Sequence, residues 1–312
     1  MNNRIKTSSR LFLFVCMVFT MACQKPETSL PPSSKQTVSK EFSDYWYQGK
    51  AEVNRYEIEQ ARYGEIRKGD AVLIFVTEDF NSEKQVKLEN YNDEAKAKAI
   101  PILKMNFVVN FNTGIYPYSV MTSVFTPVDL SKTLKISNTV QEWCGHTYTQ
   151  LNLKSNQYVY EGHSYFENEA DESYTIGAEL LEDEIWTLIR VNPQSLPLGK
   201  IKIIPGLIQA RFLHRRTDVE SATAAITEST SEGDSLLTYS IKYDTYQRDL
   251  NITFKKSFPH EIVSFEGTYI DGFGSKAKLL KTKAVRTHHL QLDYWTKNSE
   301  KDSSYRFELG LK

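Results

Sequence analysis

The repeated alternation of apolar and polar residues in the C-terminal part of the chain is the feature that most limits how it can fold. Apolar side chains occupy every second position in five short runs, at 237–243, 250–254, 263–265, 290–294 and 305–309. A period of two is that of a β-strand. Strands that follow one another without helices between them form antiparallel meanders. The sequence therefore predicts a mainly β protein, with a large curved antiparallel sheet that closes as a barrel or half-barrel and carries one or two short helices.

The N-terminal part contains further strands with more mixed patterns. The continuous apolar run 71–76 predicts a strand that is buried on both faces. The spacing in 51–58 fits a bulged strand, with an amphipathic helix as the alternative. The polar stretch 67–70 predicts a turn, and Asn112-Thr113-Gly114 predicts a tight hairpin.

Helical spacing occurs in the segment 179–190, where apolar residues recur on one broad face before Asn192-Pro193 ends the helix. This helix separates an N-terminal β half, 42–192, from a C-terminal antiparallel β half, 193–312. The two halves can also form one continuous domain. We expect either a filled core or a curved sheet whose concave face holds an apolar ligand.

The first 22 residues have the pattern of an export signal. Arg4, Lys6 and Arg10 precede the apolar stretch 11–22, which is too short to span a bilayer as a stable helix.

The signal ends in Thr20-Met21-Ala22-Cys23, which resembles the bacterial lipobox with Thr20 in place of the usual Leu. In such proteins the signal is removed before the cysteine, and lipid is attached to its sulfur. We therefore expect lipidation of Cys23 to anchor the protein in the cell envelope, at the outer membrane. The alternative is an ordinary secretory signal followed by an unrelated cysteine. The Pro- and Ser-rich stretch 23–41 reads as a disordered tether.

Charge and cysteine content exclude two other classes of protein. Three of the 38 basic residues lie in the signal, so the remaining chain has 35 basic and 39 acidic residues and a net charge of −4. No basic excess is available to neutralise phosphates, which argues against a nucleic-acid partner. After removal of Cys16 and lipidation of Cys23, Cys144 has no partner within the chain, so no disulfide framework is expected.

The densest group of side chains that could bind a metal or take part in catalysis lies in two neighbouring segments, 142–148 and 160–167. If Ser155-Asn156 is a two-residue hairpin loop, Tyr148 lies opposite His163, and continued pairing would place His146 opposite Tyr165 and Cys144 opposite Glu167. A shift of one residue would move the second set to the other face. The candidate functional face comprises Glu142, Trp143, Cys144, His146, Tyr148, His163, Tyr165 and Glu167.

Three interpretations of this face are open. Cys144, His146, His163 and Glu167 have side chains that could bind zinc, although their spacing matches no established zinc motif. Cys144 or Ser164 could act as a nucleophile with a histidine, but the strand-turn-helix context of a hydrolase elbow is missing. The third interpretation is a half-buried aromatic hairpin in which Cys144 packs as a small apolar group.

Several runs resemble an uncharacterised family of Bacteroidota lipoproteins whose members are often labelled septum formation inhibitor Maf. They are W-Y-Q-G-K-A-E, Q-A-R-Y-G-E-I-R, N-T-G-I-Y-P-Y-S, V-Q-E-W-C-G-H and H-S-Y-F-E-N-E-A-D. The resemblance extends from Tyr45 to the end of the chain. It implies an exported lipoprotein but assigns no catalytic residue, because the Ser-x-Ser-Pro-Arg-Arg motif of the Maf nucleotide pyrophosphatases does not occur here.

Together these features predict a lipid-anchored envelope protein whose β domain binds an apolar ligand or an envelope partner. The alternative is an envelope enzyme, such as a metal-dependent hydrolase, that uses the face formed by Cys144, His146 and His163.

Overall fold

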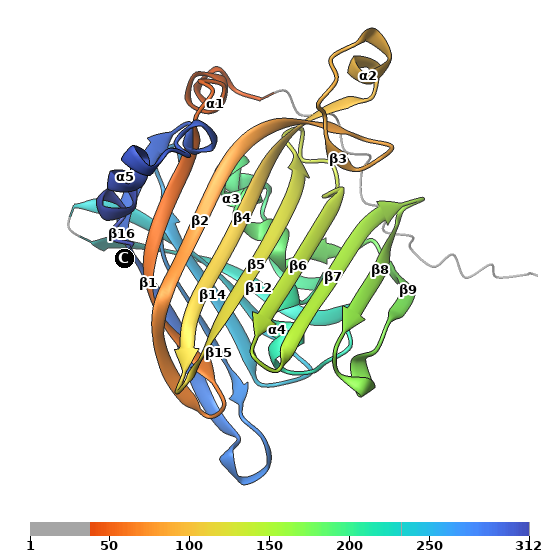
Figure 1. Ribbon diagram of the computed structural model, residues 1–312, viewed down its shortest axis with the longest axis vertical. Coiled ribbons are helices and arrows are strands. Elements are labelled where there is room, and N and C mark those ends of the chain that lie inside the picture. Colours follow the sequence, from red (N-terminus) through yellow and green to blue (C-terminus); the bar gives the residue numbers. More distant parts are fainter. Residues whose placement is uncertain (1–37, 232, 312) are drawn as a thin grey trace, which may run out of the picture. The chain divides into compact units, whose positions relative to one another are not determined.

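A computed structural model describes residues 38–231 and 233–311 (Figure 1). The predicted export signal, Cys23 and most of the predicted tether lie outside the described residues. The described chain is mainly β and forms one 16-stranded sheet that is not closed, which confirms the predicted fold class. The pairing is antiparallel except between the short strands β10 and β11, which run parallel.

The sheet consists of two meanders. The first contains β1 (Ala51–Arg62), β2 (Glu65–Asn81), β3 (Val86–Lys87), β4 (Ala99–Thr113), β5 (Tyr116–Pro127), β6 (Lys135–Glu142), β7 (Gly145–Lys154), β8 (Gln157–Ser164) and β9 (Glu172–Gly177). The second contains β10 (Leu180–Leu181), β11 (Gly199–Ile204), β12 (Glu220–Ser231), β13 (Asp234–Tyr243), β14 (Arg248–Lys255), β15 (Ile262–Asp271) and β16 (Lys278–Leu292).

The pairing of β1 with β16 joins the two meanders. Their register runs from Ala51 opposite Leu292 to Glu59 opposite Lys283, and it shifts between Arg55 and Tyr56. The extra residue at this shift is Thr287 of β16, so the strand predicted for 51–58 is confirmed, but the bulge lies in its partner β16. The strand order places the first and last strands of the sheet in its middle and leaves β9 and β10 at its two ends.

Short helices cover the sheet. They are α1 (Lys40–Trp46), α2 (Asp93–Ala97), α3 (Ile185–Val191), α4 (Leu207–Phe212), α5 (Ser304–Glu308) and the 3-10 turns η1 (Glu167–Glu169), η2 (Glu182–Glu184), η3 (Pro193–Ser195), η4 (Gly274–Lys276), η5 (Tyr294–Thr296) and η6 (Glu300–Ser303).

Helices α3 and α4 lie inside the curve of the sheet, between the strands of the two meanders (Figure 1). Trp186 of α3 contacts Phe107 of β4, with ring centres 5.7 Å apart, and Phe265 of β15, at 5.0 Å. Because α3 packs against both meanders, the inner face of the sheet forms a filled core, which was one of the two expected arrangements.

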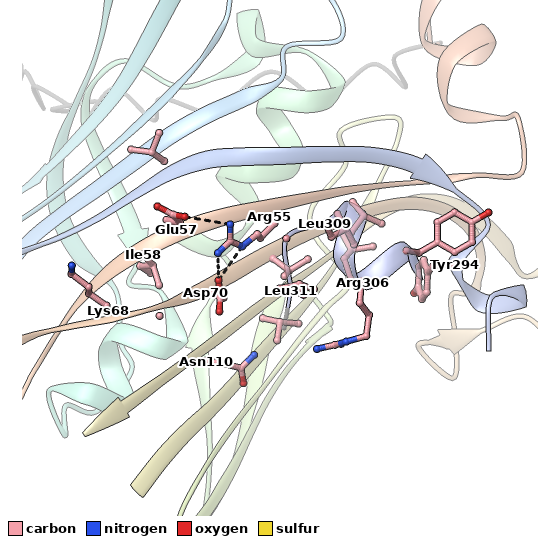
Figure 2. A pocket seen from close by; sticks show the side chains of 18 of the residues that line it. Arg55, Glu57, Ile58, Lys68, Asp70, Asn110, Tyr294, Arg306, Leu309 and Leu311 are labelled. Atoms are coloured by element: carbon pink, nitrogen blue, oxygen red, sulfur yellow. Dashed lines mark hydrogen bonds and ion pairs between the residues drawn. The ribbon is translucent and has the colours of Figure 1, made fainter. Parts of the chain in front are cut away.

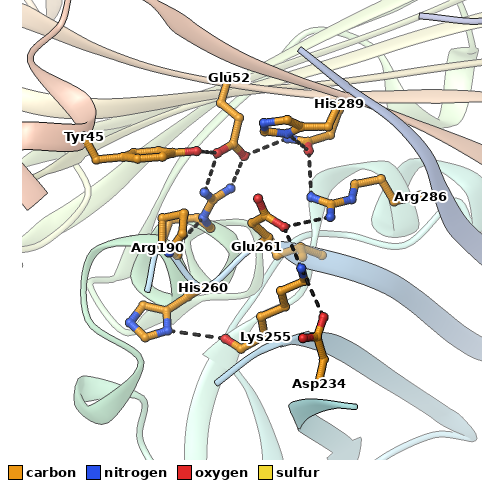
Figure 3. A network of polar contacts seen from close by, with 12 residues as sticks. Tyr45, Glu52, Arg190, Asp234, Lys255, His260, Glu261, Arg286 and His289 are labelled. Carbon is orange, nitrogen blue, oxygen red and sulfur yellow. Dashed lines mark hydrogen bonds and ion pairs between the residues drawn. The ribbon is translucent and has the colours of Figure 1, made fainter. Parts of the chain in front are cut away.

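A fully buried ion pair fixes α3 to the sheet. Arg190 of α3 donates to both carboxylate oxygens of Glu52 on β1, and the Tyr45 hydroxyl of α1 donates to the same carboxylate (Figure 3). The Arg190 guanidinium also lies over the Trp46 ring of α1. Burial alone would raise the pKa of the Glu52 carboxyl, but the adjacent Arg190 charge and the hydrogen bonds from Arg190, Tyr45 and Asn54 together outweigh it and lower this pKa to about 2. One carboxylate therefore holds together the first strand, α1 and α3.

Two sequence-based assignments in the second half are wrong. The predicted helix 179–190 begins only at Ile185, because Leu180 and Leu181 pair with β11 and the next three residues form η2. The predicted strand 305–309 is helix α5. There Phe307 is 76% exposed, whereas Leu309 is 9% exposed. The two side chains thus do not share a buried face, as a strand would require.

The turn predicted at 67–70 is also wrong. These residues lie inside β2, and the β1–β2 turn is formed by Tyr63 and Gly64, which both have positive φ. Gly69 is needed for a different reason: a Cβ there would collide with the carbonyl oxygen of Asn110 on β4.

We expect Arg190→Met to lower the free energy of unfolding by about 3–5 kcal/mol, because it leaves the Glu52 carboxylate buried without its cation. Lys256→Met is the control, since Lys256 and Glu228 form an ion pair with both side chains about half exposed, and its loss should cost less than about 1 kcal/mol. Urea denaturation of both variants measures the difference, and equal losses would contradict the structural role given to Arg190.

Candidate functional site

The hairpin that carries the candidate functional face has the predicted register. Ser155 and Asn156 form its two-residue loop with positive φ, and Tyr148 lies opposite His163. The two rings stack, with centres 6.4 Å apart. Strand β8 ends at Ser164, however, so the pairing does not continue to Tyr165 or Glu167.

The remaining candidates lie around the turns next to this hairpin. Trp143 and Cys144 form the exposed turn between β6 and β7. Glu142 is buried and accepts a hydrogen bond from the Cys144 backbone N–H at 2.7 Å. It also accepts a hydrogen bond from the Cys144 thiol, which raises the pKa of that thiol and makes Cys144 a poorer nucleophile.

The four predicted zinc ligands are not gathered into one site. His146 lies opposite Gln141, and His163 contacts Asp171 at 3.1 Å. Glu167 begins η1 beyond the end of β8. Among residues 38–231 and 233–311, no group of three or more His, Cys, Asp or Glu side chains could hold a metal ion.

The interior contains acids that the sequence analysis did not single out. Glu182 forms a buried ion pair with Arg248 and accepts a hydrogen bond from Tyr243. Asp183 accepts a hydrogen bond from the backbone N–H of Leu207, at the start of α4, at 2.9 Å. The Asp183 contact attaches α4 to η2, and the Glu182 contacts attach η2 to β13 and β14. Only a cavity of about 80 Å³ remains beside them, which is too small for an acyl chain.

The attachment of α4 depends on the absence of a side chain at Gly206 and on the protonation of Asp183. A Cβ at Gly206 would lie 2.6 Å from a Glu182 carboxylate oxygen, which its ion pair with Arg248 holds in place. Burial raises the pKa of Asp183 to about 7, and the neighbouring Glu182 charge adds to the effect.

A large hollow lies on the opposite, outer face of the sheet. It is a groove of about 1250 Å³ over β1, β2, β4 and β16, beside the C-terminal segment 293–311 (Figure 2). Its floor is apolar where Val53, Val72, Ile74 and Val108 face outward. In a sheet with one solvated face, such positions would be polar.

The apolar floor explains the run 71–76. Ala71, Leu73 and Phe75 face the inner core, whereas Val72, Ile74 and Val76 belong to the outer cluster. This arrangement confirms the predicted burial on both faces. Residues 309–311 cover only part of the outer face of this strand run. The part that they leave uncovered forms the groove.

A tight helix end holds the wall of the groove in place. After α5, the N–H of Gly310 bonds to the carbonyl of Phe307, and the N–H of Leu311 bonds to that of Arg306. This pattern of two bonds requires a positive φ at Gly310, which is +67°. A Cβ there would also lie 2.5 Å from the His288 ring of β16. Leu309 and Leu311 are thereby placed against the sheet.

The other end of the groove is charged. Arg55 donates to Asp70 at 2.6 Å and lies 3.4 Å from Glu57 (Figure 2). Beyond this cluster, Lys68 and Lys283 lie on either side of Glu59. The sheet floor of the groove therefore changes from apolar to charged along its length, while Lys297, Asp302 and Arg306 of the C-terminal segment line the wall. The polarity of this floor matches an amphiphile.

The sequence contained one signal for this groove. The two-faced run 71–76 indicated that something must cover the outer face of β2, but the covering segment was predicted to be a strand. The lining residues come from both ends of the chain, and no local pattern connects them.

Comparison with known protein families, curated proteins and solved structures found no match to this chain. The resemblance to Bacteroidota lipoproteins therefore stays a prediction. None of the helices within the described residues has the length and apolar character needed to cross a bilayer.

Asp183→Asn should flatten the pH dependence of stability. Because the pKa of Asp183 is about 7 in the folded state and 3.8 in the reference state, the folded protein holds a proton between these values that the unfolded chain has lost. Stability should therefore fall as pH rises from 4 to 7, by about 1.4 kcal/mol for each pH unit from this group.

Denaturation curves at several pH values in this window test the expectation. Asp244→Asn, at an exposed position, serves as the control and should keep the wild-type slope. A wild-type slope in Asp183→Asn would exclude Asp183 as its source.

Proposed function

We propose that this protein is a lipid-anchored component of the bacterial cell envelope that binds the hydrocarbon chain of an amphiphile in its outer groove. The main observation behind this proposal is the groove of about 1250 Å³, whose apolar floor lies on a sheet face that would ordinarily be solvated. The export signal and the cysteine at position 23 support the location.

The backbone of the groove floor favours a hydrocarbon chain over a peptide. Strands β16, β1, β2 and β4 are consecutive in the sheet, so the N–H and C=O groups in the floor already pair with neighbouring strands. A peptide lying on this floor would bury its own N–H and C=O groups without partners, at a cost of about 1–3 kcal/mol for each group. A saturated chain has no such groups.

The filled interior supports the choice of the outer face. Trp186, Phe107 and Phe265 occupy the space inside the curve, and the residual cavity is about 80 Å³. An apolar ligand within the concave face would have to displace these rings. In the outer groove it would cover Val72, Ile74 and Val108 instead.

Binding should tighten with the length of the hydrocarbon chain. Each methylene buried in the groove contributes about 0.8 kcal/mol, so each pair of methylenes should improve the dissociation constant by about tenfold. Calorimetry with decanoate, dodecanoate and tetradecanoate measures this series. The full-length Cys23→Ser chain is used, so that no attached lipid competes.

Val108→Trp should abolish the binding, because the larger ring fills the floor of the groove. Met121→Trp is the matched control: Met121 lies directly opposite Val108 on β5 but does not line the groove. Binding that is independent of chain length, or equal in both variants, would contradict the proposal.

The membrane anchor has a separate test. Cells that express the protein should incorporate labelled palmitate into the wild type and into Cys144→Ser, but not into Cys23→Ser. Cys144→Ser controls for acylation at the only other cysteine downstream of the signal. Equal labelling of wild type and Cys23→Ser would remove the proposed anchor.

A further inference from the structure

Three charged residues form a row across the charged end of the groove. Glu59 on β1 lies directly opposite Lys68 on β2 and opposite Lys283 on β16. Neighbouring strands are about 4.8 Å apart, so the two lysine backbones flank Glu59 across about 10 Å. All three residues line the groove.

The two lysines in this row have no ion-pair partner among the described residues, so a ligand can pair with them. In the neighbouring row, Arg55 is engaged with Asp70 and Glu57. By contrast, neither Lys68 nor Lys283 forms an ion pair with any residue of the described ranges, and both side chains are exposed. One carboxylate between two ammonium groups gives this row a net charge of +1, which the net charge of −1 on the neighbouring Arg55–Asp70–Glu57 cluster balances over the whole charged end of the groove.

The distance from this row to the apolar end fits one long hydrocarbon chain. Six residues of β1 separate Glu59 from Val53, which corresponds to about 20 Å at the rise of a strand. Val53 packs in the same cluster as Leu309 and Leu311, at the wall of the groove. A chain that begins beside the lysines and ends under the C-terminal segment would pass Val285 of β16 at the edge of the Arg55–Glu57 cluster before it reaches the apolar floor.

We infer that the ligand of the groove is a single-chain amphiphile with an anionic head, either a carboxylate or a phosphate, held between Lys68 and Lys283. This inference rests on the proposed function, because it assumes that the hydrocarbon chain occupies the apolar floor. It adds the charge of the head and the direction in which the ligand lies.

Four ligands with the same tetradecyl or tetradecanoyl chain separate the alternatives: tetradecanoate, tetradecanoyl lysophosphatidate, tetradecanoyl monoglyceride and tetradecylamine. We expect the two anionic ligands to bind the full-length Cys23→Ser chain about three- to tenfold more tightly than the monoglyceride, the range for two exposed ion pairs. The amine should bind most weakly. Added salt should reduce the preference, and the relative affinities of the carboxylate and the phosphate identify the head group.

The double variant Lys68→Gln/Lys283→Gln should lose the preference for anionic heads and keep its affinity for the monoglyceride. Lys256→Gln/Lys281→Gln is the matched control, since it removes the same net charge at lysines that pair with Glu228 and Glu266 outside the groove. This control should retain the preference.

Two results would overturn the inference without contradicting hydrocarbon binding in the groove. They are equal affinity for the charged and neutral ligands, or a preference for anionic heads that survives in Lys68→Gln/Lys283→Gln. If the wild type binds none of the four ligands, the proposed function itself is wrong.

Discussion

The pairing of β1 with β16 is the constraint on which the rest of the structure depends. It joins two meanders that could otherwise form separate sheets, and it brings the two ends of the folded chain into the middle of the sheet. Glu59 and Lys283 become neighbours through this pairing alone. Each hairpin is a local event, but contacts between residues so distant in sequence carry a large loop-closure cost. The side chains packed on both faces of these strands must offset it.

The two faces of the central strands are stabilised in different ways. On the inner face, α3 and α4 fill the curve. The buried pair Glu52–Arg190 attaches α3 to β1, and the buried pair Glu182–Arg248 attaches η2, which precedes α3, to β14. A buried pair is costly to desolvate and becomes strongly destabilising when one partner is lost. Such pairs therefore favour one position of η2 and α3 over others. On the outer face, the short C-terminal segment covers only part of the apolar surface.

This difference decides where a ligand fits. The concave face of a curved sheet is the natural place to expect an apolar ligand, but here aromatic rings occupy it. The acids near it are engaged in fastening helices, as the contacts of Glu182 and Asp183 illustrate. The exposed hydrophobic surface is instead left on the convex side, where a hydrocarbon chain would replace water without displacing any part of the core.

The sequence by itself determined the period-two strands, the strand at 51–58, the two-faced character of 71–76 and the Ser155–Asn156 hairpin, because each depends on neighbours within a few residues. It misassigned α5, since alternate apolar residues at 305–309 look like a strand until a sheet is present to bury Leu309 and leave Phe307 exposed. The tertiary structure decided the strand order, the filled interior and the groove. The row formed by Lys68, Glu59 and Lys283 combines strands more than 200 residues apart, and such proximity is set by the competition among long-range pairings, which no local pattern records.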